Sequence, residues 1–182
     1  MRAVALFCGA GTIRRLMRTL ILLRHAKAVR ANEADSDEAR GLTGRGRREA
    51  ALAGAAIEHA GLQPTLALVS TATRTRETAE FGLQNFALAT EFDDALYHAE
   101  RESIWDAFMA SDAETVIVVG HNPGIGELVS SLIHQAHDGS KLGREFSGNF
   151  PTAAFAAFEI KGDLLRAAGP RLITAWKPDR GD

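Results

Sequence analysis

Short apolar runs alternate with amphipathic stretches along most of the chain, and these runs have the length and composition of buried strands. The clearest is TVIVVG at residues 115–120, which is rich in β-branched side chains. We expect the two runs nearest the C-terminus to be antiparallel strands. Strands are predicted at six places: residues 19–23, 65–70, 87–92, 115–120, 152–160 and 171–176.

Stretches with helical periodicity lie between these runs. Thr43 precedes the first stretch and is a good N-cap, and Gly61 follows it at a position that commonly ends a helix. Asn122 and Pro123 begin the last stretch, and we expect them to be its N-cap and its first helical residue. Helices are predicted at four places: residues 44–60, 71–81, 99–110 and within 121–135.

The alternation of strands and helices predicts an α/β fold with three layers, α/β/α, around a mostly parallel central sheet. The chain contains no internal repeat, low-complexity tract or linker, so residues 17–182 are expected to form a single domain. We expect residues 1–16 to be either an extension of that domain or the result of a misplaced start at Met1 instead of Met17. This segment resembles a secretory signal only weakly, because glycines and two arginines interrupt its apolar patch.

Composition disfavours several classes of function. The formal net charge is −2, with 21 Lys and Arg against 23 Asp and Glu, so nucleic acid is not expected as the principal partner. No apolar run reaches the length of a membrane span. Cys8 is the only cysteine, which excludes a disulfide framework and suits a cytoplasmic protein. The net charge is still compatible with a local anion-binding site, because such a site requires only a few cations at one place.

Unusual side chains follow three of the predicted strands. Arg24 and His25 come directly after the first strand, Arg74 lies in the first turn of the helix after the second, and His121 follows residues 115–120. In open parallel sheets, ligands bind beyond the carboxyl ends of the strands. If these three strands are neighbours, the four side chains form one cationic cluster.

Two guanidinium groups and two imidazoles around one point suit a phosphoryl group, since arginine binds phosphate oxygens in a bidentate manner. Nearby positive charge disfavours protonation of an imidazole, so we expect His25 to be neutral near pH 7 and able to attack phosphorus. Glu77 and Thr78 lie three and four residues after Arg74, on the same helix face, and are expected to hold its guanidinium.

The other charged residues have ordinary interpretations. Taken alone, His121 would more often be a capping or core histidine, and Arg24 or Arg74 a surface ion-pair partner. Solvated positions are predicted for Lys27 at the pocket rim, the acidic segment 35–38, Arg45, Arg47, Arg48 and Arg76. No metal or cofactor is predicted, because no metal-ligand spacing links His59, His98, His134 and His137.

Three segments of the chain resemble the histidine phosphatase superfamily, which includes phosphoglycerate mutases and acid phosphatases. They are LRHAK at 23–27, STATRTRETA at 70–79 and VGHNPG at 119–124. Further segments are similar to the SixA-type phosphohistidine phosphatases within it: LTGRGRREA at 42–50, DALYHA at 94–99 and FPTAAFAAFEI at 150–160. The similarity runs from about Met17 to Trp176.

The resemblance implies a phosphoglycerate mutase-like fold and a metal-independent phosphatase. It implies that His25 is the phosphorylated nucleophile and that Arg24, Arg74 and His121 form the phosphate pocket. The implied partner is a phosphorylated protein, such as a histidine-containing phosphotransfer domain. The chain departs from the family in ways that remove no pocket charge: Ala26 replaces a frequent Gly, Thr71 a usual Pro and Glu77 a frequent Gln.

Larger members of the superfamily carry an acidic residue that protonates the leaving oxygen. Asp94 and Glu100 lie in about the corresponding region, but no motif assigns this role to either. An alkoxide leaves poorly without such an acid, whereas the P–N bond of phosphohistidine is labile. Weak acid machinery therefore favours phosphohistidine over a sugar phosphate as substrate.

Three rival hypotheses remain. CGAGTIR at residues 8–14 matches the C-x5-R loop of cysteine-dependent phosphatases, but only four residues separate Arg14 from Thr19, too few for the helix that such a loop requires. A second rival is a phosphomonoesterase acting on a small phosphorylated metabolite. A third is a non-catalytic domain that binds a phosphorylated ligand, which the presence of all four pocket residues disfavours.

Overall fold

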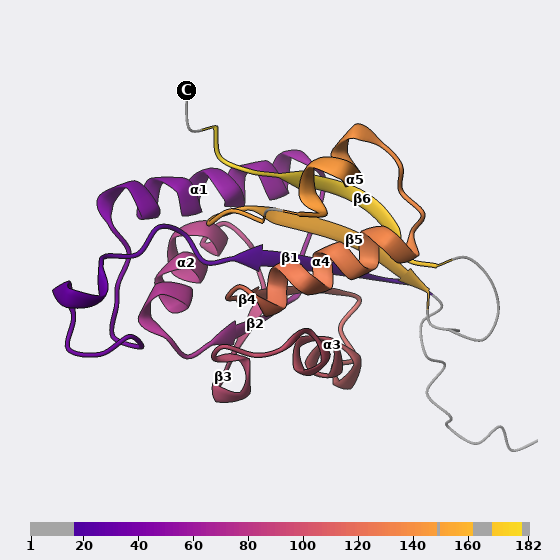
Figure 1. Cartoon of the computed structure of the whole chain (residues 1–182). Coiled ribbons are helices and arrows are strands. Elements are labelled where there is room, and N and C mark those ends of the chain that lie inside the picture. Colours follow the sequence, from indigo (N-terminus) through magenta and orange to yellow (C-terminus); the bar gives the residue numbers. More distant parts are fainter. Residues whose placement is uncertain (1–16, 149, 162–168, 180–182) are drawn as a thin grey trace, which may run out of the picture.

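A six-stranded sheet forms the centre of the computed structural model, with strand order β3-β2-β4-β1-β5-β6 (Figure 1). The structure describes residues 17–148, 150–161 and 169–179. Residues 1–16, which include Cys8 and the C-x5-R motif, lie outside the described residues. The strands are β1 (Met17–Arg24), β2 (Leu66–Ser70), β3 (Ala89–Asp93), β4 (Thr115–Gly120), β5 (Phe155–Lys161) and β6 (Arg171–Trp176).

The sheet is mostly parallel, as the alternating pattern predicts. β1 pairs in parallel with β4, and β2 pairs in parallel with both β4 and β3. β5 is antiparallel to β1 and to β6, so the expected antiparallel strands near the C-terminus are present. All six strands lie where the apolar runs predict them, with ends that differ by a few residues.

Helices cover both faces of the sheet and complete the predicted three layers (Figure 1). α1 and α2 pack on one face, while α3, α4 and α5 pack on the other. α5 is a short helix that the sequence pattern did not indicate. The helices are α1 (Gly44–His59), α2 (Thr73–Leu83), α3 (Arg101–Ala110), α4 (Gly124–Gln135) and α5 (Lys141–Phe146), with 3-10 turns η1 (Ala31–Glu33) and η2 (Asp94–Leu96). Within the described ranges, no helix is long and apolar enough to cross a membrane.

The alternating apolar side chains of β1 show why both faces of the sheet are buried. Its successive side chains point to opposite faces. Leu20 and Leu22 join the core under α3 and α4, while Ile21 and Leu23 join the core under α1 and α2. Both faces of β1 are therefore apolar from Leu20 to Leu23, and polar side chains follow at the carboxyl end of the strand, at Arg24 and His25.

The two predicted helix starts differ in outcome. Thr43 caps α1 as expected, because its side chain accepts a hydrogen bond from the Gly46 amide. The prediction for Asn122 is wrong: α4 begins at Gly124, and Pro123 occupies the N-cap position without a side-chain cap. The Asn122 amide group donates instead to the Phe150 carbonyl, 3.1 Å away, so a tertiary contact replaces the local cap.

Candidate active site

The sheet order brings the three predicted strand ends together. β4 lies between β1 and β2, and Arg24 is in register with Gly120. The His25 amide continues this pairing by donating to the Gly120 carbonyl at 3.0 Å. His121, which follows Gly120, therefore lies beside His25 at the carboxyl edge of the sheet, and Ser70, the last residue of β2, lies beside His121.

A cavity of about 250 Å³ opens at this edge. All four predicted site residues, Arg24, His25, Arg74 and His121, line it. Its volume is below the range of about 300–1,000 Å³ that is typical of sites enclosing whole small molecules. The cavity therefore suits a small group, such as a phosphoryl group, with the rest of the ligand outside.

His25 has one ring nitrogen fixed by the backbone. Its Nδ1 lies 2.8 Å from the Ala26 carbonyl. Because a carbonyl can only accept, Nδ1 carries the proton and Nε2 carries the lone pair. Burial lowers the pKa of His25 to about 4, a value that includes the smaller lowering by the Arg74 and Arg24 guanidinium groups and the opposing effect of the hydrogen bond to Ala26. His25 is thus neutral near pH 7, as expected from the charges, although burial is the larger cause.

His121 lies 5.2 Å from His25, measured between ring centroids, and is only 2 % exposed. Its Nε2 is 2.8 Å from the hydroxyl of buried Ser70. Burial lowers its pKa to about 3, with smaller contributions from His25, Arg74 and His98. Nδ1 is buried and has no hydrogen-bond partner within the described part of the chain. When Ser70 donates to Nε2, Nδ1 carries a proton that a phosphoryl oxygen can accept.

The two arginines approach the cavity from different elements. Arg24, at the end of β1, donates from Nη1 to the Phe150 carbonyl at 2.8 Å. The same carbonyl accepts from Asn122, so one backbone group holds side chains from β1 and from the β4–α4 connection. Arg74, in the first turn of α2, has a side chain that is 3 % exposed.

The predicted support for Arg74 is wrong. Glu77 accepts a hydrogen bond from the Leu42 amide, and Thr78 binds the Ala26 amide and the Arg74 carbonyl, so neither holds the guanidinium. Both side chains bind backbone groups of the loop after β1 or of α2. Asp37 holds the guanidinium instead, through its carbonyl at 2.6 Å and its Oδ2 at 2.9 Å.

Asp37 is the site residue that sequence reasoning missed. It belongs to the acidic segment 35–38, which was predicted to be solvated, and its side chain is indeed 42 % exposed. It nevertheless lines the cavity and accepts hydrogen bonds from Arg40, Arg74, Tyr97 and His98. These donors, Arg40 foremost, hold the pKa of its carboxyl far below the usual range. No local motif marks Asp37, because its partners other than Arg40 come from distant parts of the chain.

Other candidates lie at or away from the cavity. His98 lines it, with its ring centroid 5.1 Å from that of His121, whereas Asp94 and Glu100 do not. Lys27 lines it and is exposed, as expected for a rim charge. Arg76 is exposed and bonds to the Thr71 carbonyl, in agreement with its predicted surface position.

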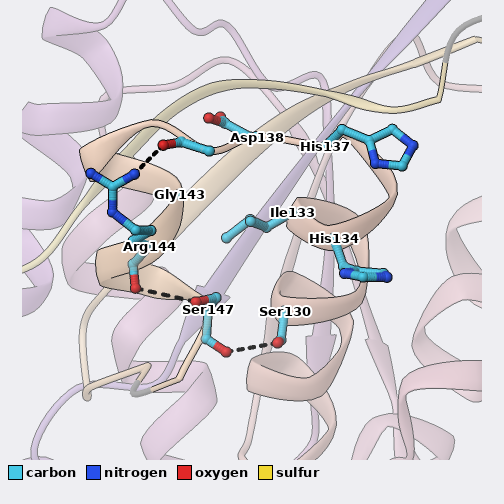
Figure 2. A pocket seen from close by; sticks show the side chains of 9 residues that line it. Ser130, Ile133, His134, His137, Asp138, Gly143, Arg144 and Ser147 are labelled. Atoms are coloured by element: carbon cyan, nitrogen blue, oxygen red, sulfur yellow. Dashed lines mark hydrogen bonds between the residues drawn. The ribbon is translucent and has the colours of Figure 1, made fainter.

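A second cavity of about 520 Å³ lies between α4 and α5 (Figure 2). Its lining includes His134, His137 and Arg144, all of which are exposed. Figure 2 shows the two imidazoles pointing away from Arg144, whose guanidinium donates to the Gly139 carbonyl nearby. These groups do not converge on one point, so the smaller cavity is the better candidate for an active site.

Comparison with known proteins identifies the family of the chain. Residues 20–102 match the model of the histidine phosphatase superfamily (branch 1). An uncharacterized protein of Mycobacterium tuberculosis is 30 % identical over 143 residues, which cover 77 % of this chain and 88 % of that relative.

Solved structures with the same fold extend the comparison to nearly the whole chain. A protein of Nakamurella multipartitia, assigned as the phosphohistidine phosphatase SixA, has 33 % identity and a TM-score of 0.76, with 89 % of this chain and 96 % of that chain covered. A protein of Agrobacterium tumefaciens with the same assignment has 29 % identity and a TM-score of 0.74, with 88 % and 98 % covered. The protein histidine phosphatase SixA complexed with tungstate, at 21 % identity and a TM-score of 0.68, shares the fold over 87 % of this chain and 96 % of its own.

Proposed function

The chain belongs to the histidine phosphatase superfamily and is a phosphatase of the SixA type, and on that premise we propose that His25 attacks phosphorus and becomes transiently phosphorylated. The observation that carries this proposal is the state of its ring. Nδ1 is bound to the Ala26 carbonyl, Nε2 has the lone pair, and the pKa of about 4 keeps the imidazole neutral. Arg24, Arg74 and His121 line the same cavity. The two arginines supply the positive charge that a phosphoryl group requires, and neutral His121 supplies a hydrogen-bond donor.

The reaction has two steps. In the first, Nε2 of His25 forms a bond to phosphorus while the bond from phosphorus to the leaving nitrogen or oxygen breaks, and the leaving atom keeps the electron pair and gains a proton. In the second, water attacks phosphorus and gives up a proton, the P–N bond to His25 breaks, and phosphate departs. Arg24 and Arg74 stabilise the charge on the equatorial oxygens in both steps.

Phosphohistidine on a phosphotransfer protein is the proposed substrate. The small cavity admits a phosphoryl group and leaves the carrier outside, as a protein substrate requires. Two solved relatives above 25 % identity are assigned as phosphohistidine phosphatases. The P–N bond of phosphohistidine also makes little demand on an acid, and neither Asp94 nor Glu100 lines the cavity.

One observation favours a second candidate, a phosphomonoesterase acting on a small metabolite. His98 lines the cavity, and its Nε2 lies 3.3 Å from Asp37 Oδ2. An imidazole held beside a carboxylate can protonate a leaving oxygen, which is the help that an alkyl phosphate requires. Relative turnover of phosphohistidine protein and of an alkyl phosphate distinguishes the two candidates.

Trapping the phosphorylated enzyme tests the proposal. Wild-type protein quenched during turnover of labelled phosphohistidine protein should carry acid-labile label on His25, and the His25→Ala variant should carry none. Cys8→Ala is the control for the cysteine-based rival and should retain full activity, as should protein treated with EDTA. Full activity of the His25→Ala variant would falsify the proposed mechanism, and turnover of small phosphomonoesters alone would exclude the proposed substrate.

A further inference from the structure

Asp37 lies at the centre of a hydrogen-bond network that joins three separate parts of the chain. Its Oδ1 accepts from Arg40 Nη1 at 2.7 Å. Its Oδ2 accepts from Arg74 Nη2 at 2.9 Å, from the Tyr97 hydroxyl at 2.9 Å and from His98 Nε2 at 3.3 Å. One carboxylate thus connects the loop after β1, the first turn of α2 and the segment after η2.

Two residues that follow Asp37, Glu38 and Arg40, attach its segment to the rest of the domain. The Glu38 carbonyl accepts from the Thr73 amide at 2.9 Å, which fixes the segment against the start of α2. Arg40 Nε donates to the Val29 carbonyl at 2.9 Å. Asp37 is therefore held in place by the fold, although its side chain is partly exposed.

Asp37 leaves Arg74 able to bind a phosphoryl group. The Asp37 carbonyl and carboxylate accept from Nη1 and Nη2, which fixes the plane of the guanidinium. A guanidinium has five N–H donors. Asp37 accepts from two of them, and the Arg74 side chain lines the cavity, so donors remain for phosphoryl oxygens.

Asp37 also balances charge at the cavity. Four permanent cations line the cavity, Arg24, Lys27, Arg40 and Arg74, and Asp37 is the only carboxylate among the described residues that line it. Without Asp37, Arg40 and Arg74 would repel each other and could separate. With it, both point toward one acceptor.

We propose that Asp37 is a positioning residue that fixes Arg74 for phosphoryl binding and attaches the Tyr97–His98 segment to the cavity mouth. This inference rests on the proposed phosphatase function of the same site. It assigns Asp37 no contact with the substrate, because its effect on phosphate passes through the guanidinium of Arg74.

Oxyanion binding by the full-length protein tests this inference apart from turnover. The probe is orthovanadate, and the variants are Asp37→Asn, Asp37→Glu, Arg74→Ala and the double variant Asp37→Asn/Arg74→Ala. Asp35→Asn, two residues away and exposed, is the matched control. We expect Asp37→Asn to weaken vanadate binding at least about tenfold and to lower kcat/KM by a similar factor. Asp37→Glu should recover part of the loss, and Asp35→Asn should change neither quantity.

The double variant decides whether Asp37 acts through Arg74. In the Arg74→Ala background, Asp37→Asn should add little further loss, since the two residues then act as one unit. If the losses of vanadate affinity in the two single variants add fully in the double variant, the inference is overturned. Tighter vanadate binding by Asp37→Asn would also overturn it, because Asp37 would then compete with phosphate for Arg74. Circular dichroism confirms that each variant is folded. If wild-type protein binds vanadate but turns over no phosphorylated substrate, the proposed function fails while the positioning role is still tested.

Discussion

The cavity beside His25 has about half the volume of the cavity between α4 and α5, 250 Å³ against 520 Å³, yet it is the smaller one that gathers reactive groups. Both are lined by histidine and arginine. In the smaller cavity, His121 and Arg74 are buried and bonded to other elements of the fold. In the larger one, His134 and Arg144 are exposed, and Arg144 bonds within five residues of itself.

The difference follows from where each cavity lies in the fold. The smaller cavity lies where three parallel strands end, so residues distant in sequence meet there: Ser70 and His121 are 51 positions apart. The larger cavity lies between two consecutive helices, where the neighbours are close in sequence. Burial and convergence on one point, rather than volume or residue type, therefore distinguish the candidate active site. Matched substitutions in the two cavities test this distinction.

Removing a histidine from each cavity should give the largest contrast. His25→Ala is expected to lower kcat about 10⁴-fold or more, because the variant lacks the proposed nucleophile. His134→Ala should leave kcat and KM unchanged, since this imidazole is exposed. Steady-state kinetics with phosphohistidine protein measures both. A comparable loss in His134→Ala would make the larger cavity part of the active site and contradict the comparison.

Removing an arginine from each cavity should give the next largest contrast. Arg74→Ala is expected to lower kcat/KM by about 10²–10³-fold, the usual effect of deleting a donor that stabilises transition-state charge. Arg74→Lys should restore only part of this, because an ammonium group cannot reproduce the planar fork. Arg144→Ala should behave as wild type in the same assay. Equal activity of Arg74→Ala and Arg144→Ala would remove Arg74 from the proposed phosphate pocket.

Much of the smaller cavity could be predicted from sequence because strand ends are local features. The apolar run of β1 stops at Arg24 and His25, and the fold rule for parallel sheets then places these residues near His121. Asp37 could not be predicted in the same way. Its bonds to Arg74 and Tyr97 span 37 and 60 positions and depend on the path of an irregular loop.

The predicted N-cap role of Asn122 is wrong because a tertiary contact overrides the local capping rule. Its residue type and the following proline are typical of an N-cap, but its amide group binds the Phe150 carbonyl, 28 positions away. α5 escaped prediction because it is short and lacks a long periodic pattern. Asp37 and Asn122 are thus misassigned because they bind partners that are distant in sequence.

The imidazoles of His25 and His121 should have lower pKa values than a histidine of the unfolded chain. The pKa of His25 is about 4 and that of His121 about 3, against 6.5 for an unperturbed imidazole. Below pH 6.5 the unfolded chain binds protons that the folded chain does not, so the free energy of unfolding should fall as pH falls from 6.5 toward 4. NMR titration of the imidazoles measures the pKa values, and His25→Gln assigns the signal. Titration of His25 near pH 6.5 would contradict its burial among cations.

Removing one serine hydroxyl at each place should give the smallest contrast: Ser130 lines the larger cavity, and Ser70 binds His121, which lines the smaller one. Ser70 Oγ lies 2.8 Å from His121 Nε2, whereas Ser130 Oγ donates to the Ser147 carbonyl at 2.7 Å. A single neutral hydrogen bond contributes about 1 kcal/mol, so Ser70→Ala should lower kcat/KM about fivefold by releasing the His121 ring. Ser130→Ala should leave kcat/KM unchanged, because its bond joins α4 to the end of α5 and touches no group of the active site. The ratio of the two kcat/KM values, measured in one assay, tests whether the Ser70 hydroxyl supports activity by orienting His121. If Ser70→Ala has the same kcat/KM as Ser130→Ala, the orientation of the His121 ring does not depend on Ser70.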